Sequence, residues 1–196
     1  MPNREVTKED LDALRRIAAA WARVGAYLST APGVGPVDLE GLIIATARVA
    51  PDDERLFVVA ASWLAAHHSF VNGRRLAVLA ATLADEEGSA EASAVLGALL
   101  SWADELSGNA AEALRAATAC CRPVRPARPL FRVVRALPSV AAQVRRDSLP
   151  RFAAWGLWHD GDAAKPEAVR PVAWIVAHAP ELRIRALVSS ETAASN

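Results

Sequence analysis

Hydrophobic residues in the first part of the chain recur every three or four positions, which is the period of an α-helix. The clearest stripe consists of Leu11, Leu14, Ile17, Ala18, Trp21, Val24 and Leu28. Thr7 precedes this stripe and acids follow at positions 9 and 10, a pattern typical of a helix N-terminus. The spacing predicts a helix over residues 8–29, ended by the Gly- and Pro-rich segment 31–36.

The same period predicts five more helices before residue 122. Asp38 can cap the second helix and Pro51 can stand in the first turn of the third. The third is apolar nearly all round, which predicts a position in the middle of the fold. The expected ranges are 38–49, 51–70, 74–88, 89–106 and 110–121.

Prolines at positions 138, 150, 166, 171 and 180 prevent long helices in the last third of the chain. We expect short helices there, over residues 139–147, 150–158, 167–178 and 181–187. Residues 130–137 could instead form a strand because Val and Phe favour strands, but no second convincing strand is evident to pair with them. The predicted fold class is all-α, a multi-helix bundle.

The chain has 196 residues and 53% of them are hydrophobic, enough for a substantial core. The N-terminus lacks the apolar core of a signal peptide, and no apolar run approaches the ~18 residues that span a bilayer. We expect a cytoplasmic protein without membrane contact. The predicted organisation is a helical bundle over 1–121, an extended connector over 122–138, a small helical part over 139–188 packed on the bundle, and a disordered tail over 189–196.

Charge divides the chain. Residues 1–110 contain 9 basic and 15 acidic residues, a net charge of −6, whereas residues 111–196 contain 13 and 7, a net charge of +6. Between positions 115 and 151 there are nine arginines and one acid, Asp147. Such a block predicts binding of phosphates or of an acidic partner. The alternative is that it neutralises the acidic half of the same fold.

Arginine and proline both recur every three residues from position 122, the period of polyproline II, so the connector should be extended with its guanidinium groups along one edge. Guanidinium groups bind phosphate and carboxylate bidentately. Trp155 and Trp158 lie beyond the connector, where with Phe152 they could stack on single-stranded bases or anchor a protein partner, or belong to the core. The candidate binding arginines of this region are Arg122, Arg125, Arg128, Arg132, Arg135, Arg145, Arg146 and Arg151.

A second candidate is a helix-turn-helix motif over residues 56–84. Asn72 could cap its second helix and place Arg74 and Arg75 in the first turn, where DNA contacts are made. The alternative is an ordinary antiparallel helix pair with two surface arginines.

The cysteines and histidines give little indication of a disulfide, a metal site or a catalytic site. Cys120 and Cys121 are adjacent and without other cysteines, so no disulfide framework is expected. His67 and His68 point about 100° apart on a helix, which does not suit one metal ion. His159 and His178 are isolated and are expected to be solvent-exposed or capping residues. Cys120 or Cys121 could be a nucleophile with His67, but no local signature supports this. The sequence has no Gly-rich phosphate loop, nucleophile elbow or metal-binding helix motif, and we predict no catalytic residues, metal or cofactor.

The sequence therefore predicts a non-enzymatic regulatory or binding protein whose arginines engage nucleic acid or an acidic protein, with oligomerisation left open. The alternatives are a structural protein–protein interaction subunit that binds no nucleic acid, and a small enzyme with a pocket in its helical core.

Overall fold

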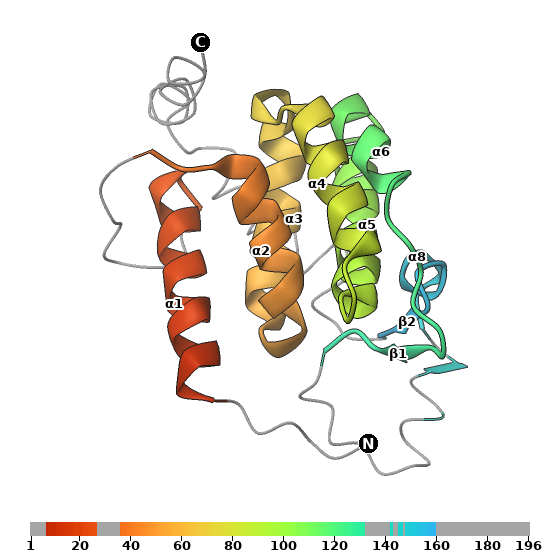
Figure 1. The fold of residues 1–196 in the computed structure, drawn as a ribbon. Coiled ribbons are helices and arrows are strands. Elements are labelled where there is room, and N and C mark those ends of the chain that lie inside the picture. The colour runs from red at the N-terminus through yellow and green to blue at the C-terminus, as the bar shows by residue number, and fades with distance from the viewer. Residues whose placement is uncertain (1–6, 27–35, 132–141, 143–144, 147, 160–196) are drawn as a thin grey trace.

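The computed structural model describes residues 7–26, 36–131, 142, 145–146 and 148–159. The expected all-α fold is confirmed, since helices form nearly all of the regular structure in these residues (Figure 1). The α-helices are α1 (Lys8–Arg23), α2 (Leu39–Val49), α3 (Glu54–His67), α4 (Gly73–Asp85), α5 (Ala90–Leu106), α6 (Glu112–Thr118) and α8 (Pro150–Ala153). Two 3₁₀ helices, η1 (Ala50–Asp52) and η2 (His68–Phe70), flank α3, and two short strands are β1 (Arg128–Pro129) and β2 (Leu157–Trp158).

The predicted helix caps are present. The Thr7 hydroxyl accepts a hydrogen bond from the Asp10 amide at 3.2 Å, and the Asp10 carboxylate accepts one from the Thr7 amide, which is a capping box. Asp38 caps α2. The first helix is shorter than expected: α1 ends at Arg23 because Gly25 takes a left-handed conformation, with φ of 94°.

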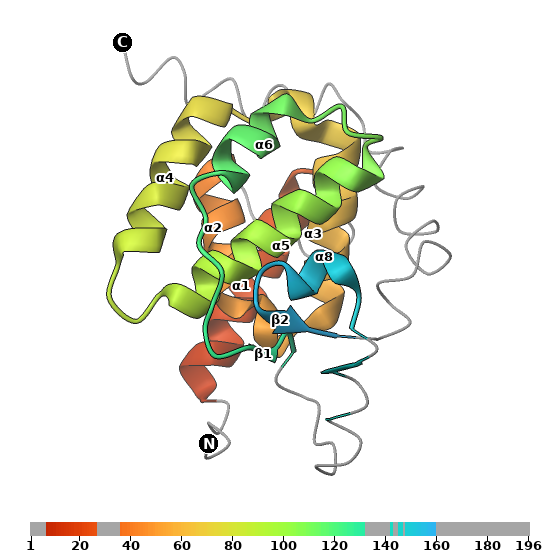
Figure 2. The same ribbon diagram turned by 90° about the vertical axis from the view of Figure 1, so that its right-hand side faces the viewer.

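Helix α5 is at the centre of the bundle and packs against α2, α3, α4, α6 and α8 (Figures 1 and 2). The predicted burial of the third helix is confirmed, since every residue from Leu56 to Leu64 is buried. Burial of α5 over residues 93–100 was not expected, because only one stripe of it is large and apolar. The remaining residues over 93–99 are Ala, Gly and Ser, which let neighbouring helices approach closely.

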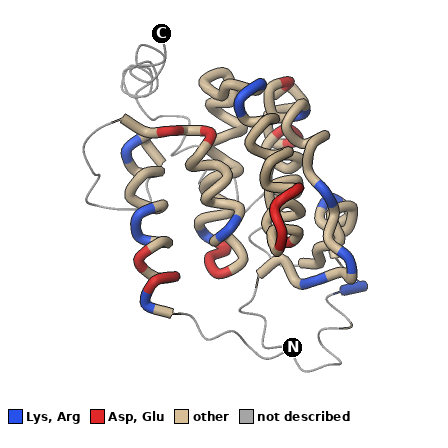
Figure 3. Tube along the Cα trace, viewed as in Figure 1, with Lys and Arg blue, Asp and Glu red and all other residues tan. Residues whose placement is uncertain are grey.

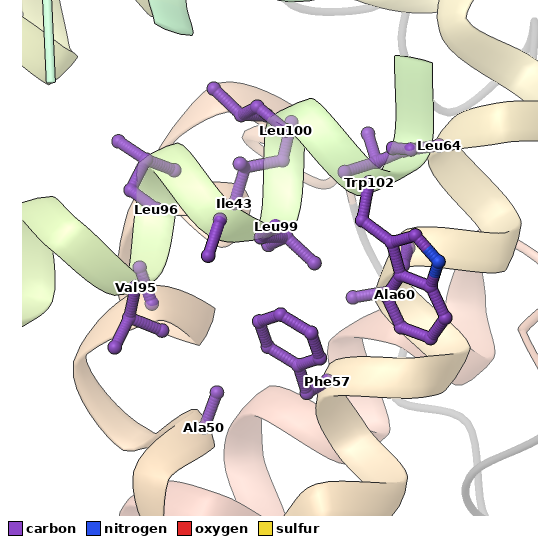
Figure 4. Packing of buried hydrophobic residues seen from close by; sticks show 14 of the residues in the cluster. Ile43, Ala50, Phe57, Ala60, Leu64, Val95, Leu96, Leu99, Leu100 and Trp102 are labelled. Atoms are coloured by element: carbon purple, nitrogen blue, oxygen red, sulfur yellow. The ribbon is translucent and has the colours of Figure 1, made fainter. Parts of the chain in front are cut away.

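Aromatic rings fill the centre of the core. Phe57 from α3 stacks on Trp102 from α5 with ring centroids 5.7 Å apart, and Figure 4 shows both beside the aliphatic side chains of α2 and α5. Trp21, predicted to lie on the apolar stripe of the first helix, and Trp63 are also fully buried. The Trp21 indole N–H donates to the Thr46 hydroxyl at 2.8 Å, which joins α1 to α2.

The expected helix over 150–158 is wrong in its second half. Helix α8 ends at Ala153, Gly156 has φ of 71°, and Leu157–Trp158 form β2, which pairs in parallel with β1. This pair is too short to produce a sequence pattern. The predicted helices over 167–178 and 181–187 and the tail over 189–196 lie outside the described residues, as do most of 132–147.

No helix in the part of the chain that the structure describes is both long and apolar enough to cross a membrane.

Candidate functional site

The first ten residues of the connector, 122–131, lie against the segment that contains α8 and β2 (Figure 2). Three connector amides donate hydrogen bonds to carbonyl oxygens of that segment: Val124 to Trp155 at 3.0 Å, Arg128 to Gly156 at 2.9 Å, and Leu130 to Trp158 at 3.1 Å. The Arg125–Pro126 peptide bond is cis. The connector backbone is therefore bound to its own chain, not free in solution as a linker would be.

Glycine is required at two points of this contact. A Cβ at Gly156 would lie 2.0 Å from the Val124 carbonyl oxygen. A Cβ at Gly97, on α5, would lie 2.5 Å from the ring of Trp155. The two glycines let the connector, the α8 segment and α5 pack in direct contact.

The predicted aromatic residues have different environments. Phe152 is fully buried, and Trp155 packs over Gly97 with its indole N–H donating to the Ser101 hydroxyl at 3.2 Å. Trp158 is only partly buried, and no aromatic ring of the described residues stacks on it. Of these three side chains, Trp158 has the most freedom to meet a ligand.

Two connector arginines form ion pairs with acids of the first half of the chain. The Arg122 Nη2 lies 2.6 Å from the Asp85 Oδ1, and the side chains are 66% and 68% exposed. The Arg128 Nη1 lies 3.8 Å from the Glu91 Oε2. Arg125, between them, is exposed and has no ion pair or hydrogen bond with any described residue. The connector thus lies on acidic helices and also presents its arginines to solvent.

The remaining arginines of this region extend the same edge. Arg151 lies 3.1 Å from the Glu105 carboxylate, while Arg145 and Arg146 are exposed. Figure 3 shows Lys and Arg positions, in blue, along the connector and beside the α8 segment. Arg132 and Arg135 lie outside the described residues. We call the described set, Arg122, Arg125, Arg128, Arg145, Arg146 and Arg151, the basic edge.

The predicted helix-turn-helix segment forms α3, η2 and α4, and Asn72 caps α4 by accepting a hydrogen bond from the Arg75 amide at 3.1 Å. The Arg75 guanidinium is held by Asp38 at 2.6 Å and by the buried Glu40 at 3.2 Å. Arg74 is exposed and has no ion pair with a described residue. Only one of the two arginines is therefore available at this helix terminus.

His159 is buried, with 6% of its surface exposed, so the expectation that it faces solvent is wrong. Its ring meets Phe131 edge to face with centroids 4.8 Å apart, and its amide donates to the Ser148 hydroxyl. The Nε2 lies 3.3 Å from the Glu54 Oε1, although without hydrogen-bond geometry. The aromatic core beneath the α8 segment explains the burial, and an isolated histidine in the sequence gave no sign of it.

Two other candidates for chemistry, His67 and Cys121, are buried. His67 is buried against Trp63, with ring centroids 4.9 Å apart. Burial raises the pKa of the Cys121 thiol to about 12, with a smaller effect from Cys120. No group of three or more metal-ligating side chains occurs among the residues that the structure describes.

Sequence reasoning missed the acids that face the basic edge. Asp85 and Arg122 are 37 positions apart, and no local spacing relates them. The only available signal was the opposite charge of the two halves, which predicts attraction without identifying partners.

Fold and site together define an all-α helical protein with an arginine-rich edge. Comparisons with family models, with curated proteins and with solved structures found no match for this chain.

Proposed function

We propose that the protein is a non-enzymatic, cytoplasmic binding protein that takes a polyanionic partner, nucleic acid or an acidic protein, on the basic edge. The exposed arginines of the connector are the observation that supports it. The connector amides at positions 124, 128 and 130 are bonded to the chain itself, so the backbone is held in place, and the Arg122 and Arg125 side chains are exposed. Holding them in place lowers the entropy cost of binding a partner.

Arg125 is the central residue of the proposed surface. Its guanidinium has no acidic neighbour among the described residues, so a phosphate or carboxylate can bind it without displacing anything. Arg145 is likewise exposed and has no ion pair with a described residue. Isolated exposed cations are ordinary surface residues, but several arginines on one edge raise the local potential for anions.

The three ion pairs of the basic edge support a second function. In that case Arg122, Arg128 and Arg151 only join the two halves of the fold, and the protein is an interaction subunit that binds no polyanion. The two functions make opposite predictions for Arg125, which forms no such pair.

The test measures binding of a labelled single-stranded oligonucleotide of about 16 nucleotides and of a labelled poly-glutamate peptide over a range of salt. We expect salt-dependent binding of at least one probe. In Arg125→Gln the slope of log affinity against log salt should become shallower, by about 0.7 for one phosphate contact to a single strand.

Arg55→Gln is the matched control, because Arg55 is an exposed arginine on α3 without an ion pair to any described residue. It should bind like the wild type. Arg74→Gln, tested on duplex DNA, addresses the helix-turn-helix hypothesis separately. Absence of binding to both probes and to duplex at low salt would leave the interaction-subunit function in place of the proposed one.

A further inference from the structure

We infer that Asp85 and Glu91 are internal competitors at the basic edge, and that single-stranded nucleic acid binds there by replacing their carboxylates with its phosphates. This inference rests on the proposed function and deepens it. It predicts that removing these two acids strengthens binding beyond the effect of the lost negative charge.

The Arg122–Asp85 ion pair can open without disturbing the fold. Both side chains are about two-thirds exposed, so water can solvate the separated charges. The position of Arg122 is fixed independently, because its backbone amide donates to the Ser93 hydroxyl at 2.9 Å. A phosphate can therefore exchange with Asp85 while the connector stays in place.

The Arg128–Glu91 ion pair is looser. Its closest nitrogen–oxygen distance is 3.8 Å, which is longer than the 2.7–2.9 Å typical of a charge-assisted hydrogen bond. The Arg128 amide is held separately by the Gly156 carbonyl. A phosphate oxygen at hydrogen-bond distance would be a better acceptor for this guanidinium than Glu91 is.

Other ion pairs of the same protein have a different construction. Glu40 is almost fully buried and accepts hydrogen bonds from both the Asn72 amide and the Arg75 guanidinium. Asp104 is also buried and accepts from the Ala111 amide and from Arg115. Opening such a pair would leave a buried charge without a partner. The more accessible pairs at positions 85 and 91 avoid most of this penalty, so they suit exchange.

Trp158 favours nucleic acid over an acidic peptide as the ligand. Its partly exposed ring lies in β2 directly opposite Pro129, one residue from Arg128. The preceding residue, Leu157, points into the core, and strand alternation directs Trp158 away from it. Every nucleic-acid base has a face on which such a ring can stack, whereas a poly-glutamate chain has none.

The experiment compares Asp85→Asn, Glu91→Gln and the double variant with Glu87→Gln in binding the labelled oligonucleotide. Glu87 is exposed, lies between the two acids in the sequence, and has no ion pair with any described residue, so it controls for the change in net charge. Each paired variant should bind about two- to fivefold more tightly than Glu87→Gln, the gain expected from releasing one accessible ion pair. Trp158→Leu should weaken oligonucleotide binding and leave poly-glutamate binding unchanged.

The outcomes distinguish failure of the internal competition from failure of the proposed binding function. If the wild type binds but all three single variants gain equally, the acids act only through net charge and the internal competition is wrong. A gain confined to poly-glutamate, or an unchanged affinity in Trp158→Leu, would instead overturn nucleic acid as the ligand. If neither the wild type nor the double variant binds either probe at low salt, the proposed function itself fails, and the inference fails with it.

Discussion

At the scale of single residues, the Cys121 thiol has the largest change in acidity that burial causes among the described groups. Its side chain is 8% exposed, and desolvation raises its pKa from 9.0 to about 12. The buried thiol stays protonated in the folded chain up to a higher pH than it does in the unfolded chain. Its contribution to the free energy of unfolding is therefore fully present below the pKa of the unfolded chain and is lost as pH rises toward the pKa of the folded chain. The free energy of unfolding should therefore fall as pH rises from 9 toward 12.

The expected loss is about 1.4 kcal/mol per pH unit across that window. Lys, Arg and Tyr also titrate at high pH, so the quantity to measure is the difference between the wild type and Cys121→Ala. Denaturant unfolding of both at several pH values gives it. Parallel pH profiles for the two proteins would show that the buried thiol does not set this dependence.

Residue-level environment was only partly predictable from the sequence. The tryptophans at positions 21, 63 and 102 lie on helical stripes, and periodicity alone indicated their burial. His159 and Trp158 are neighbours outside any periodic segment, yet His159 is buried and Trp158 is only partly buried. This difference results from their places on a two-residue strand and its continuation. Such environments depend on tertiary contacts that leave no local pattern.

At the scale of elements, Gly156 determines how α8 meets the connector. It has a φ of 71°, and the Val124 carbonyl oxygen lies where its Cβ would be. Gly88 has a similar φ of 81°, but no heavy atom lies within 4 Å of the position that a Cβ would take there. Substitution of Gly88 tests backbone strain alone, whereas substitution of Gly156 tests backbone strain together with the close contact to Val124.

We expect Gly88→Ala to lower the free energy of unfolding by about 1–2 kcal/mol, the cost of a left-handed non-glycine residue. Gly156→Ala should cost about 1–3 kcal/mol more, because the carbonyl must also move. Hydrogen exchange should then show lost protection at the amides of residues 124, 128 and 130. Equal destabilisation by the two variants, with protection retained, would contradict the role given to the contact.

The elements differ in how well the sequence predicted them. Helices α2 to α5 agree with their hydrophobic period, and Asp38 and Asn72 cap α2 and α4 as predicted, since these signals are local. The expected start of the third helix at Pro51 is wrong, because Pro51 lies in η1 and α3 begins at Glu54 after the Asp53 cap. The β1–β2 pair joins segments about 30 positions apart through two residues each, and its hydrogen bonds depend on how α8 packs against α5. Nothing local in residues 150–158 distinguishes a complete helix from a helix followed by a strand.

At the scale of the whole molecule, acids from the first half of the chain meet described arginines from the second half at the basic edge. Charge counting predicted that the arginines either neutralise the acidic half of the fold or face outward. In the structure, arginines of the basic edge can do both, because an arginine that is paired with an acid can still be exposed to solvent. Arg122 is paired and still 66% exposed, whereas Arg125 has no ion pair with a described residue. The two alternatives do not exclude each other, because an exposed ion pair contributes little to the free energy of unfolding. Its arginine can therefore still exchange the acid for an anionic ligand.

Contact between halves of opposite charge makes stability depend on salt. The three ion pairs of the basic edge are partly or largely exposed, so each contributes roughly 0.2–1 kcal/mol at low ionic strength and less when screened. Raising NaCl from about 0.05 M to about 0.5 M should lower the free energy of unfolding by about 1–2 kcal/mol in total. The triple variant Asp85→Asn, Glu91→Gln, Glu105→Gln should lose most of that dependence.

A matched triple variant, Glu9→Gln, Glu87→Gln, Glu112→Gln, removes the same charge from exposed acids that have no ion pair with any described residue. Denaturant unfolding at several salt concentrations should give it a slope close to that of the wild type, because the pairs at the basic edge remain. If both triple variants lose the salt dependence equally, net charge governs it and not the pairs. In that case the acids at positions 85 and 91 would hold the arginines too weakly to compete with a ligand, so the stability measurement also bears on the proposed exchange.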